Sequence, residues 1–142
     1  MKVSVQDLAK DDFSQDFPKV DFITLIFVLS AISPEYHLSS LQKIYDQLDD
    51  NSYFYFRDYG EYDLAQIRFA MRKDAKLKDN FYLKTDGTRC FYFNEAYLKP
   101  LFEKVGFEIQ KIETHYREVT NKKLKKVMQR VWIQAVLHKP PK

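Results

Sequence analysis

Residues 22–29 read FITLIFVL, an almost unbroken run of β-branched, aromatic and aliphatic side chains. Such a run is typical of a strand that is buried on both faces of a parallel sheet. Residues 33–35, SPE, then have the pattern of a helix start, and apolar side chains keep helical spacing up to Leu48. A second strand is expected at residues 52–56. This order of strand, helix and strand predicts an α/β fold.

The rest of the chain continues this alternation. Asn94 and Gly106 are residue types that begin and end a helix. We expect a short strand at 3–5, a helix at 62–71, a hairpin formed by 81–83 and 90–93 around Asp86-Gly87, and closing strands at 107–116 and 131–137. The predicted architecture is a mainly parallel sheet that ends in an antiparallel pair. Ligands of such sheets bind where strands end, here at 7–8, 29–34 and 57–60.

Glycine and cysteine are scarce, which excludes several kinds of site. The 142 residues contain three widely separated glycines, so no dinucleotide-binding or P-loop motif can be written. Cys90 is the single cysteine, and the three histidines lack ligand spacing, so we expect no metal site. No apolar run is long enough to cross a membrane. We expect no membrane partner and a cytoplasmic location, with the nucleus or the mitochondrion as alternatives.

The formal net charge of +3 hides an asymmetry. Residues 1–56 carry four Lys or Arg and nine Asp or Glu, a balance of −5, whereas residues 57–142 carry nineteen and eleven, a balance of +8. The second part therefore favours a polyanionic partner, although a solvated lysine-rich surface explains the same charges.

Five segments, taken in order and spacing, carry a family likeness. They are DLAKDD at 7–12, LIFVLSAISP at 25–34, FRDYG at 56–60, NFY at 80–82 and DGTR at 86–89. Together they resemble the methyltransferase-like family that makes 3-methylcytidine (m3C) in tRNA. The resemblance extends over nearly the whole chain. It implies a class I, Rossmann-like methyltransferase fold, S-adenosyl-L-methionine (SAM) as cofactor, and methyl transfer to cytosine N3 of tRNA.

The resemblance also implies roles for individual residues. Asp7 would accept a hydrogen bond from the adenine amino group, the backbone of Leu8 would reach the ring, and Ile26 would contact the cofactor. Without the resemblance, Asp7 is interpreted as the cap of a turn and Ile26 as a core residue. Asp58, with Arg57 and Tyr59 beside it, is the candidate carboxylate that faces or orients the target base. An internal Arg57–Asp58 pair is the alternative.

The RNA-binding candidates lie in the basic part of the chain. Arg89 would contact a phosphate and Tyr82 would stack on a base, unless the hairpin aromatics only cover the sheet. Further phosphate contacts are expected from Lys122, Lys123, Lys125, Lys126 and Arg130. The expected partners are tRNA and, in addition, an aminoacyl-tRNA synthetase.

Two features of the family are absent from the sequence. The Gly-rich turn after the first strand and the acidic ribose-binding residue after the second have no counterpart here. We therefore expect residues 1–142 to form a partial methyltransferase domain, lacking the first two strands of the order 3-2-1-4-5-7-6, with 22–29 as an unpaired edge. A truncated product, a chain completed by a separate N-terminal piece, and a degenerate relative all fit. A non-catalytic tRNA- or protein-binding module is the alternative function.

Overall fold

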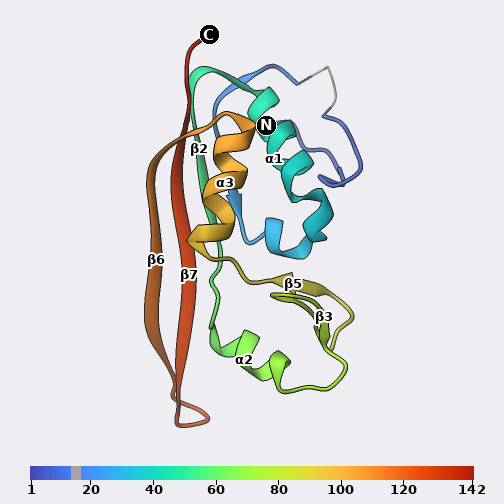
Figure 1. The fold of residues 1–142 in the computed structure, drawn as a ribbon, viewed down its shortest axis with the longest axis vertical. Coiled ribbons are helices and arrows are strands. Elements are labelled where there is room, and N and C mark those ends of the chain that lie inside the picture. The colour runs from blue at the N-terminus through green and yellow to red at the C-terminus, as the bar shows by residue number, and fades with distance from the viewer. Residues whose placement is uncertain (14–16) are drawn as a thin grey trace.

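The computed structural model describes residues 1–13 and 17–142. Its main sheet has four strands in the order β1-β2-β7-β6, and a second sheet has the order β3-β4-β5. Figure 1 shows α1 and α3 next to each other over the main sheet, with α2 and the small sheet beyond their ends. The elements are β1 (Val20–Ile26), η1 (Leu29–Ala31), η2 (Pro34–Tyr36), α1 (His37–Gln47), β2 (Leu48–Tyr59), α2 (Leu64–Ala70), β3 (Lys76–Lys78), β4 (Phe81–Leu83), β5 (Arg89–Phe91), α3 (Glu95–Val105), β6 (Glu108–Asn121) and β7 (Lys126–Lys139).

The strand order matches the 4-5-7-6 half of the expected sheet. β1 and β2 are parallel, whereas β2 with β7 and β6 with β7 are antiparallel. The antiparallel end is therefore confirmed. The parallel part is smaller than the expected mainly parallel sheet, since it consists of one strand pair among the described residues.

β1 is an edge strand, as expected, but it is less buried than its sequence suggests. Leu25 is buried, whereas Phe22 is 62% and Ile26 53% exposed. The prediction of burial on both faces is wrong for this strand, because β2 is its one neighbour in the described chain. β1 also ends earlier than predicted, since Phe27 adopts a left-handed conformation (φ 55°) before η1 begins.

The strand predicted at 3–5 does not form. These residues lie outside the strands of the model, and Val3 and Val5 are 81% and 100% exposed. A strand needs a neighbour that satisfies its N–H and C=O groups, and no described strand lies alongside this segment.

The hydrophobic core lies between the main sheet and the pair α1 and α3. Alternate residues of β2 face this core, so Phe54 and Phe56 are buried while Tyr53 and Tyr55 are 41% and 44% exposed. The helices and the neighbouring strand contribute Leu41, Ile44, Leu98, Phe102, Ile133 and Leu137. The opposite face of the main sheet is not covered by a helix of the described chain (Figure 1). We call it the outer face.

The ends of α3 are those the sequence predicts. The Asn94 side chain accepts a hydrogen bond of 2.7 Å from Tyr97 N, which satisfies one free N–H of the first turn. Gly106 ends the helix at φ 117°, a left-handed conformation that glycine adopts without strain. At the end of α1, Lys139 Nζ donates to the carbonyl oxygens of Tyr45 (2.9 Å) and Leu48 (2.7 Å).

The hairpin of β4 and β5 is confirmed, and β3 is an additional strand beside β4. Gly87 at its turn has φ 86°. Hydrogen bonds link this sheet to its surroundings: Gln66 Nε2 donates to Asn80 Oδ1 (3.1 Å), and Asn80 Nδ2 donates to Glu61 Oε2 (3.0 Å), which also accepts from Asn94 Nδ2. α2 is therefore tied to the small sheet and to the start of α3.

β6 and β7 are longer than the sequence predicts. They pair from Glu108 with His138 to Asn121 with Lys126, so the expected basic segment 121–130 is mostly a hairpin with its turn at residues 122–125. Among the helices of residues 1–13 and 17–142, none has the length and apolar character needed to span a membrane.

Candidate functional site

Asp58 is a buried carboxyl group at the carboxyl end of β2. Its side chain has no exposed surface, Oδ2 accepts a hydrogen bond from Ser30 N (2.9 Å) and Oδ1 accepts one from Tyr59 N (2.8 Å). Burial raises the pKa of Asp58 to about 6, although the hydrogen bonds from Ser30 act in the opposite direction. The contact with Ser30 joins the end of β2 to η1, so Asp58 fixes the turn that follows β1.

His37 holds the same turn from the side of α1. Its Nε2 lies 2.8 Å from the carbonyl oxygen of Ile32 and its Nδ1 lies 2.8 Å from the hydroxyl of Tyr97. A carbonyl only accepts, so Nε2 carries the proton and Nδ1 accepts from Tyr97. Burial lowers the pKa of His37 and keeps the ring neutral. Two buried side chains from different elements therefore set the conformation of residues 29–37.

A polar pocket of about 430 Å³ lies beside this turn. It brings together Asp7 and Arg89, which are far apart in the sequence. The pocket is lined by Asp7, Ala9, Lys10, Ala31, Ile32, Ser33, Glu35, Tyr36 and Arg89. Asp7 Oδ1 accepts from Ala9 N (2.9 Å), so the carboxylate caps its own turn. Arg89 Nη1 donates to Ser33 Oγ (3.1 Å) and its guanidinium lies 5.7 Å from the centre of the Phe81 ring.

Leu8 and Ile26 do not line this pocket. Leu8 packs against the core, and its carbonyl oxygen accepts a hydrogen bond of 3.1 Å from Lys43 Nζ. Ile26 pairs in register with Arg57 and is exposed at the edge of the sheet. Of the three cofactor candidates, Asp7 is the one whose side chain reaches the pocket wall.

Arg57 and Asp58 point to opposite faces of β2. Asp58 faces the helices, whereas the Arg57 guanidinium lies on the outer face, 5.0 Å from the centre of the Trp132 ring. The two side chains therefore do not form the internal Arg57–Asp58 pair that was the alternative. Tyr59 packs against Phe27 at a ring-centre distance of 4.7 Å. Sequence reasoning missed Phe27 because it was placed inside the strand, and the left-handed backbone that turns it toward Tyr59 has no signal in the sequence.

Apart from Arg89 in the pocket at Asp7, the RNA-binding candidates fall into three environments. Lys122, Lys123, Lys125 and Lys126 are exposed in or next to the hairpin turn. Tyr82 is 5% exposed and packs with Cys90 and Tyr92, so its ring is not presented for stacking in this structure. Burial also raises the pKa of Cys90 to about 11, as expected of a core residue.

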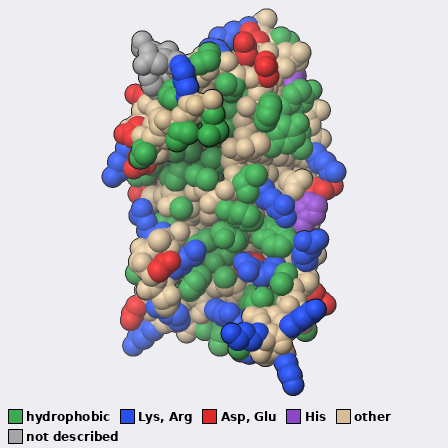
Figure 2. All heavy atoms as spheres, turned by 180° about the vertical axis from the view of Figure 1, so that it is seen from behind, with side chains coloured by type: hydrophobic (Ala, Val, Ile, Leu, Met, Phe, Trp, Pro, Cys, Tyr) green, Lys and Arg blue, Asp and Glu red, His purple; other side chains and the backbone are tan. Residues whose placement is uncertain are grey.

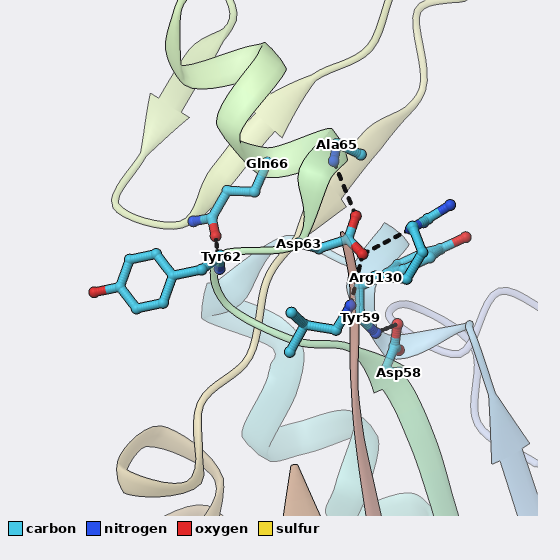
Figure 3. Close-up of polar contacts among 8 residues, drawn as sticks. Asp58, Tyr59, Tyr62, Asp63, Ala65, Gln66 and Arg130 are labelled. Atoms are coloured by element: carbon cyan, nitrogen blue, oxygen red, sulfur yellow. Dashed lines mark hydrogen bonds and ion pairs between the residues drawn. The ribbon is translucent and has the colours of Figure 1, made fainter. Parts of the chain in front are cut away.

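Arg130 is the third case, because it binds a buried carboxylate (Figure 3). Asp63 has no exposed surface, and its Oδ1 accepts from Arg130 Nε (2.8 Å) and from Val131 N (2.9 Å). Asp63 Oδ2 accepts from Ala65 N (3.0 Å) at the start of α2. Asp63 therefore attaches α2 to β7. The position of Asp63 before an apolar helical segment could have predicted its role as a helix cap. Its contact with Arg130, 67 residues later, could not be predicted from the sequence.

No group of His, Cys, Asp and Glu within the described residues has the arrangement of a metal site. The candidate ligand-binding features are the pocket at Asp7 and Arg89, the Phe27–Tyr59 pair and the Arg57 guanidinium on the outer face.

Comparisons with known proteins identify the family of this chain. The model of the family described as "Methyltransferase domain" matches residues 2–112. The human tRNA N(3)-cytidine methyltransferase METTL6 is 43% identical over 99% of this chain and 50% of its own length, and O-methyltransferase 3 of Dictyostelium discoideum is 36% identical over 96% and 32%. The chain thus spans about half the length of the METTL6 relatives it matches.

Solved structures give the same result for the fold. A SAM-dependent methyltransferase from Methanosarcina mazei superposes with a TM-score of 0.73 at 16% identity, over 98% of this chain and 67% of that one. The family model covers more than half of this chain, and the strand order is that of the class I sheet. The chain belongs to the methyltransferase domain family, has the class I SAM-dependent methyltransferase fold, and is related in sequence to the tRNA N(3)-cytidine methyltransferases.

Proposed function

We propose that this chain forms the acceptor side and the adenine side of a SAM-dependent methyltransferase that acts on cytosine N3 of tRNA. The observation that carries the proposal is the Asp58-anchored turn after β1, which lies in the LIFVLSAISP segment of a chain 43% identical to METTL6. Residues of the segment 31–36, which follows this turn, line the pocket at Asp7, and Phe27 precedes the turn and packs on Tyr59, so the turn connects the two candidate surfaces.

The pocket residues suit the adenosine end of SAM. Asp7 Oδ1 accepts from Ala9 N, and no hydrogen bond from the described residues reaches Oδ2, which would accept from an exocyclic amine. The pocket has fewer features that would bind the methionine end of SAM. None of the three glycines lines this pocket, so the described residues offer no Gly-rich turn there. When bound, SAM would supply a methyl group on a positively charged sulfur.

The acceptor side needs a flipped base held in line with that methyl group. Cytosine N3 has a lone pair, so no general base is needed to make it a nucleophile. With SAM bound, this lone pair would take up the methyl group, and the bond to sulfur would be given up to the departing S-adenosylhomocysteine. The protein's contribution is alignment. Phe27, which is 38% exposed, and Tyr59 offer an aromatic surface for stacking, and Asp58 positions the turn rather than touching the base.

The proposal is tested by methyl transfer from labelled SAM to cytidine-containing RNA. We expect Phe27→Ala to lower kcat/KM about tenfold, because base–aromatic stacking contributes about 1–3 kcal/mol. Tyr62→Ala is the matched control, since this ring is 70% exposed on another part of the molecule. Absence of transfer by the wild-type chain contradicts an active enzyme. Equal effects of both variants contradict the stacking role.

Cofactor binding is tested separately by calorimetric titration with SAM. We expect Asp7→Asn to weaken binding severalfold, because the amide presents one acceptor oxygen and no charge to the adenine amino group. Asp74→Asn, an exposed carboxylate outside the pocket, is the control. No heat of binding, or the same affinity for Asp7→Asn and wild type, removes Asp7 from the proposed site.

A non-catalytic RNA-binding module is the second candidate. The observation that favours it is the absence of a Gly-rich turn beside the pocket. It predicts salt-sensitive tRNA binding by the wild-type chain with no methyl transfer and no SAM binding. An aminoacyl-tRNA synthetase and an N-terminal piece that pairs with the free edge of β1 are further proposed partners. The exposed apolar residues of that edge support the second of these.

A further inference from the structure

The outer face of the main sheet carries a cluster of cations around the single tryptophan. The guanidinium carbons of Arg57 and Arg117 lie 5.0 Å and 6.0 Å from the centre of the Trp132 ring. His115 is paired with Trp132 across β6 and β7, and Gln134 is paired with Arg57 across β7 and β2. Figure 2 shows this face, where Lys, Arg and His side chains gather beside hydrophobic ones.

These side chains surround a pocket of about 280 Å³, lined by Arg57, His115, Tyr116, Arg117, Trp132 and Gln134. Within the described residues, Arg57 Nε and His115 Nε2 are buried side-chain atoms without a hydrogen-bond partner. A buried donor without an acceptor is costly, and native structures rarely leave one unless a ligand or water accepts from it. Arg57 Nε can only donate, so this unpaired nitrogen points to an acceptor that is not part of the described chain.

The charges around the pocket favour an anion as that acceptor. Glu113, two residues before His115 on β6, already lies 3.2 Å from Lys111 Nζ and 3.3 Å from His115 Nε2. The His115 contact lacks the alignment of a hydrogen bond. In the part of the chain that the structure describes, no ion pair involves Arg57 or Arg117. Two guanidinium groups beside one ring repel each other until an anion lies between them, and phosphate oxygens match the donor geometry of arginine.

We propose that the Arg57–Trp132–Arg117 pocket binds a backbone phosphate of RNA. This inference rests on the proposed function for the presence of RNA, but it adds a contact site on a different face of the sheet. Two observations favour RNA over an acidic protein. Five of the six pocket residues lie on β6 and β7, the two strands that the lysine-rich turn connects, and Tyr116 at the pocket rim is 76% exposed and free to stack on a base. The pocket thus lies between the hairpin turn and the end of β2.

Trp132 makes the test specific, because it is the single tryptophan of the chain. Its fluorescence is recorded while the full chain is titrated with a short oligouridine. This RNA contains no cytosine, so binding does not depend on the methyl acceptor. We expect a saturable change that inorganic phosphate reverses by competition. We expect Arg117→Gln to weaken binding about tenfold and to reduce the slope of log K against log salt by about 0.7.

Arg72→Gln is the matched control, since Arg72 is exposed in another part of the chain and outside the pocket. Arg117→Lys keeps the charge but not the paired donors, and should restore part of the affinity. The proposal is overturned if Arg117→Gln binds as Arg72→Gln does, or if RNA binding measured by anisotropy leaves the Trp132 signal unchanged. A response to poly-glutamate but not to oligouridine would assign the pocket to an acidic protein. A response to oligouridine without methyl transfer supports the pocket and contradicts the proposed enzyme.

Discussion

Asp58 and His37 are two buried ionisable residues, and they change the free energy of unfolding in opposite directions as the pH falls. His37 has a lowered pKa, so it contributes stability above its unfolded pKa, and this contribution is lost as the pH falls. Asp58 has a pKa raised to about 6, so its contribution is fully present below its unfolded pKa and is lost as the pH rises through about 6. Both act on the turn after β1, which makes the candidate site sensitive to mildly acidic pH.

Asp58→Asn isolates the carboxyl group from the other titrating residues. The asparagine cannot ionise, so the difference in free energy of unfolding between variant and wild type should shift in favour of the variant as the pH rises from 4 to 7. A pKa difference of about two units corresponds to about 3 kcal/mol. Urea denaturation at several pH values measures this difference, in which the contribution of His37 cancels. A difference that does not change with pH would show that Asp58 ionises as it does in the unfolded chain.

At the scale of elements, the attachment of α2 depends on one carboxylate. Asp63 accepts from the first turn of α2, from Arg130 and from Val131 N, so it serves two elements at once (Figure 3). Breaking a buried charged contact leaves its donors without acceptors. Asp63 therefore links the start of α2 directly to β7.

We expect Asp63→Asn to lower the free energy of unfolding by about 3 kcal/mol, because the NH2 group that replaces one carboxylate oxygen cannot accept from the donors it would face. Arg130→Gln should cost less, since its side chain is 27% exposed. A double-mutant cycle measured by urea denaturation gives the coupling between the two. Asp74→Asn, which is exposed, should change stability by less than about 0.5 kcal/mol. A coupling near zero would mean that Asp63 acts through the backbone contacts alone.

The hairpin turn of β6 and β7 carries the exposed lysines. Replacing Lys122, Lys123, Lys125 and Lys126 by glutamine should reduce the slope of log K against log salt for single-stranded RNA by up to about three, at about 0.7 for each phosphate contact. Replacing the exposed Lys73, Lys99, Lys104 and Lys142 instead removes the same charge elsewhere. Anisotropy titrations at several salt concentrations measure both. Equal slopes for the two variants would show that net charge, not the hairpin turn, binds the RNA.

At the scale of the whole molecule, the sequence predicted the elements better than the site. Periodicity and caps located α1, α3 and the antiparallel end of the sheet, because those signals are local. The face to which Arg57 points and the pairing of Arg130 with Asp63 depend on strand register and on segments far apart in the chain. The prediction of a strand at 3–5 was wrong because strand formation also depends on distant segments. Alternating apolar residues form a strand only when another strand lies beside them.

In the sheet order β1-β2-β7-β6, β1 lies at the edge and has one neighbouring strand among the described residues. Phe22 is 62% exposed and, with Thr24, Tyr53 and Tyr55, lines an apolar hollow on the outer face. An apolar strand with unpaired N–H and C=O groups favours pairing with another chain. The isolated chain should therefore self-associate, and its sedimentation coefficient should rise with concentration.

Phe22→Lys tests whether this association uses the β1 edge. A charge at an edge strand opposes pairing, so the variant should sediment as a monomer at concentrations where the wild type associates. Ile67→Lys adds the same charge at a residue of α2 that is 47% exposed, and it should leave the association unchanged. A wild-type chain that stays monomeric at all concentrations, or equal effects of the two lysines, contradicts the β1 edge as the contact. If the edge is the contact, any segment that pairs with β1 should compete with self-association, so the same measurement reports on strands that complete this sheet.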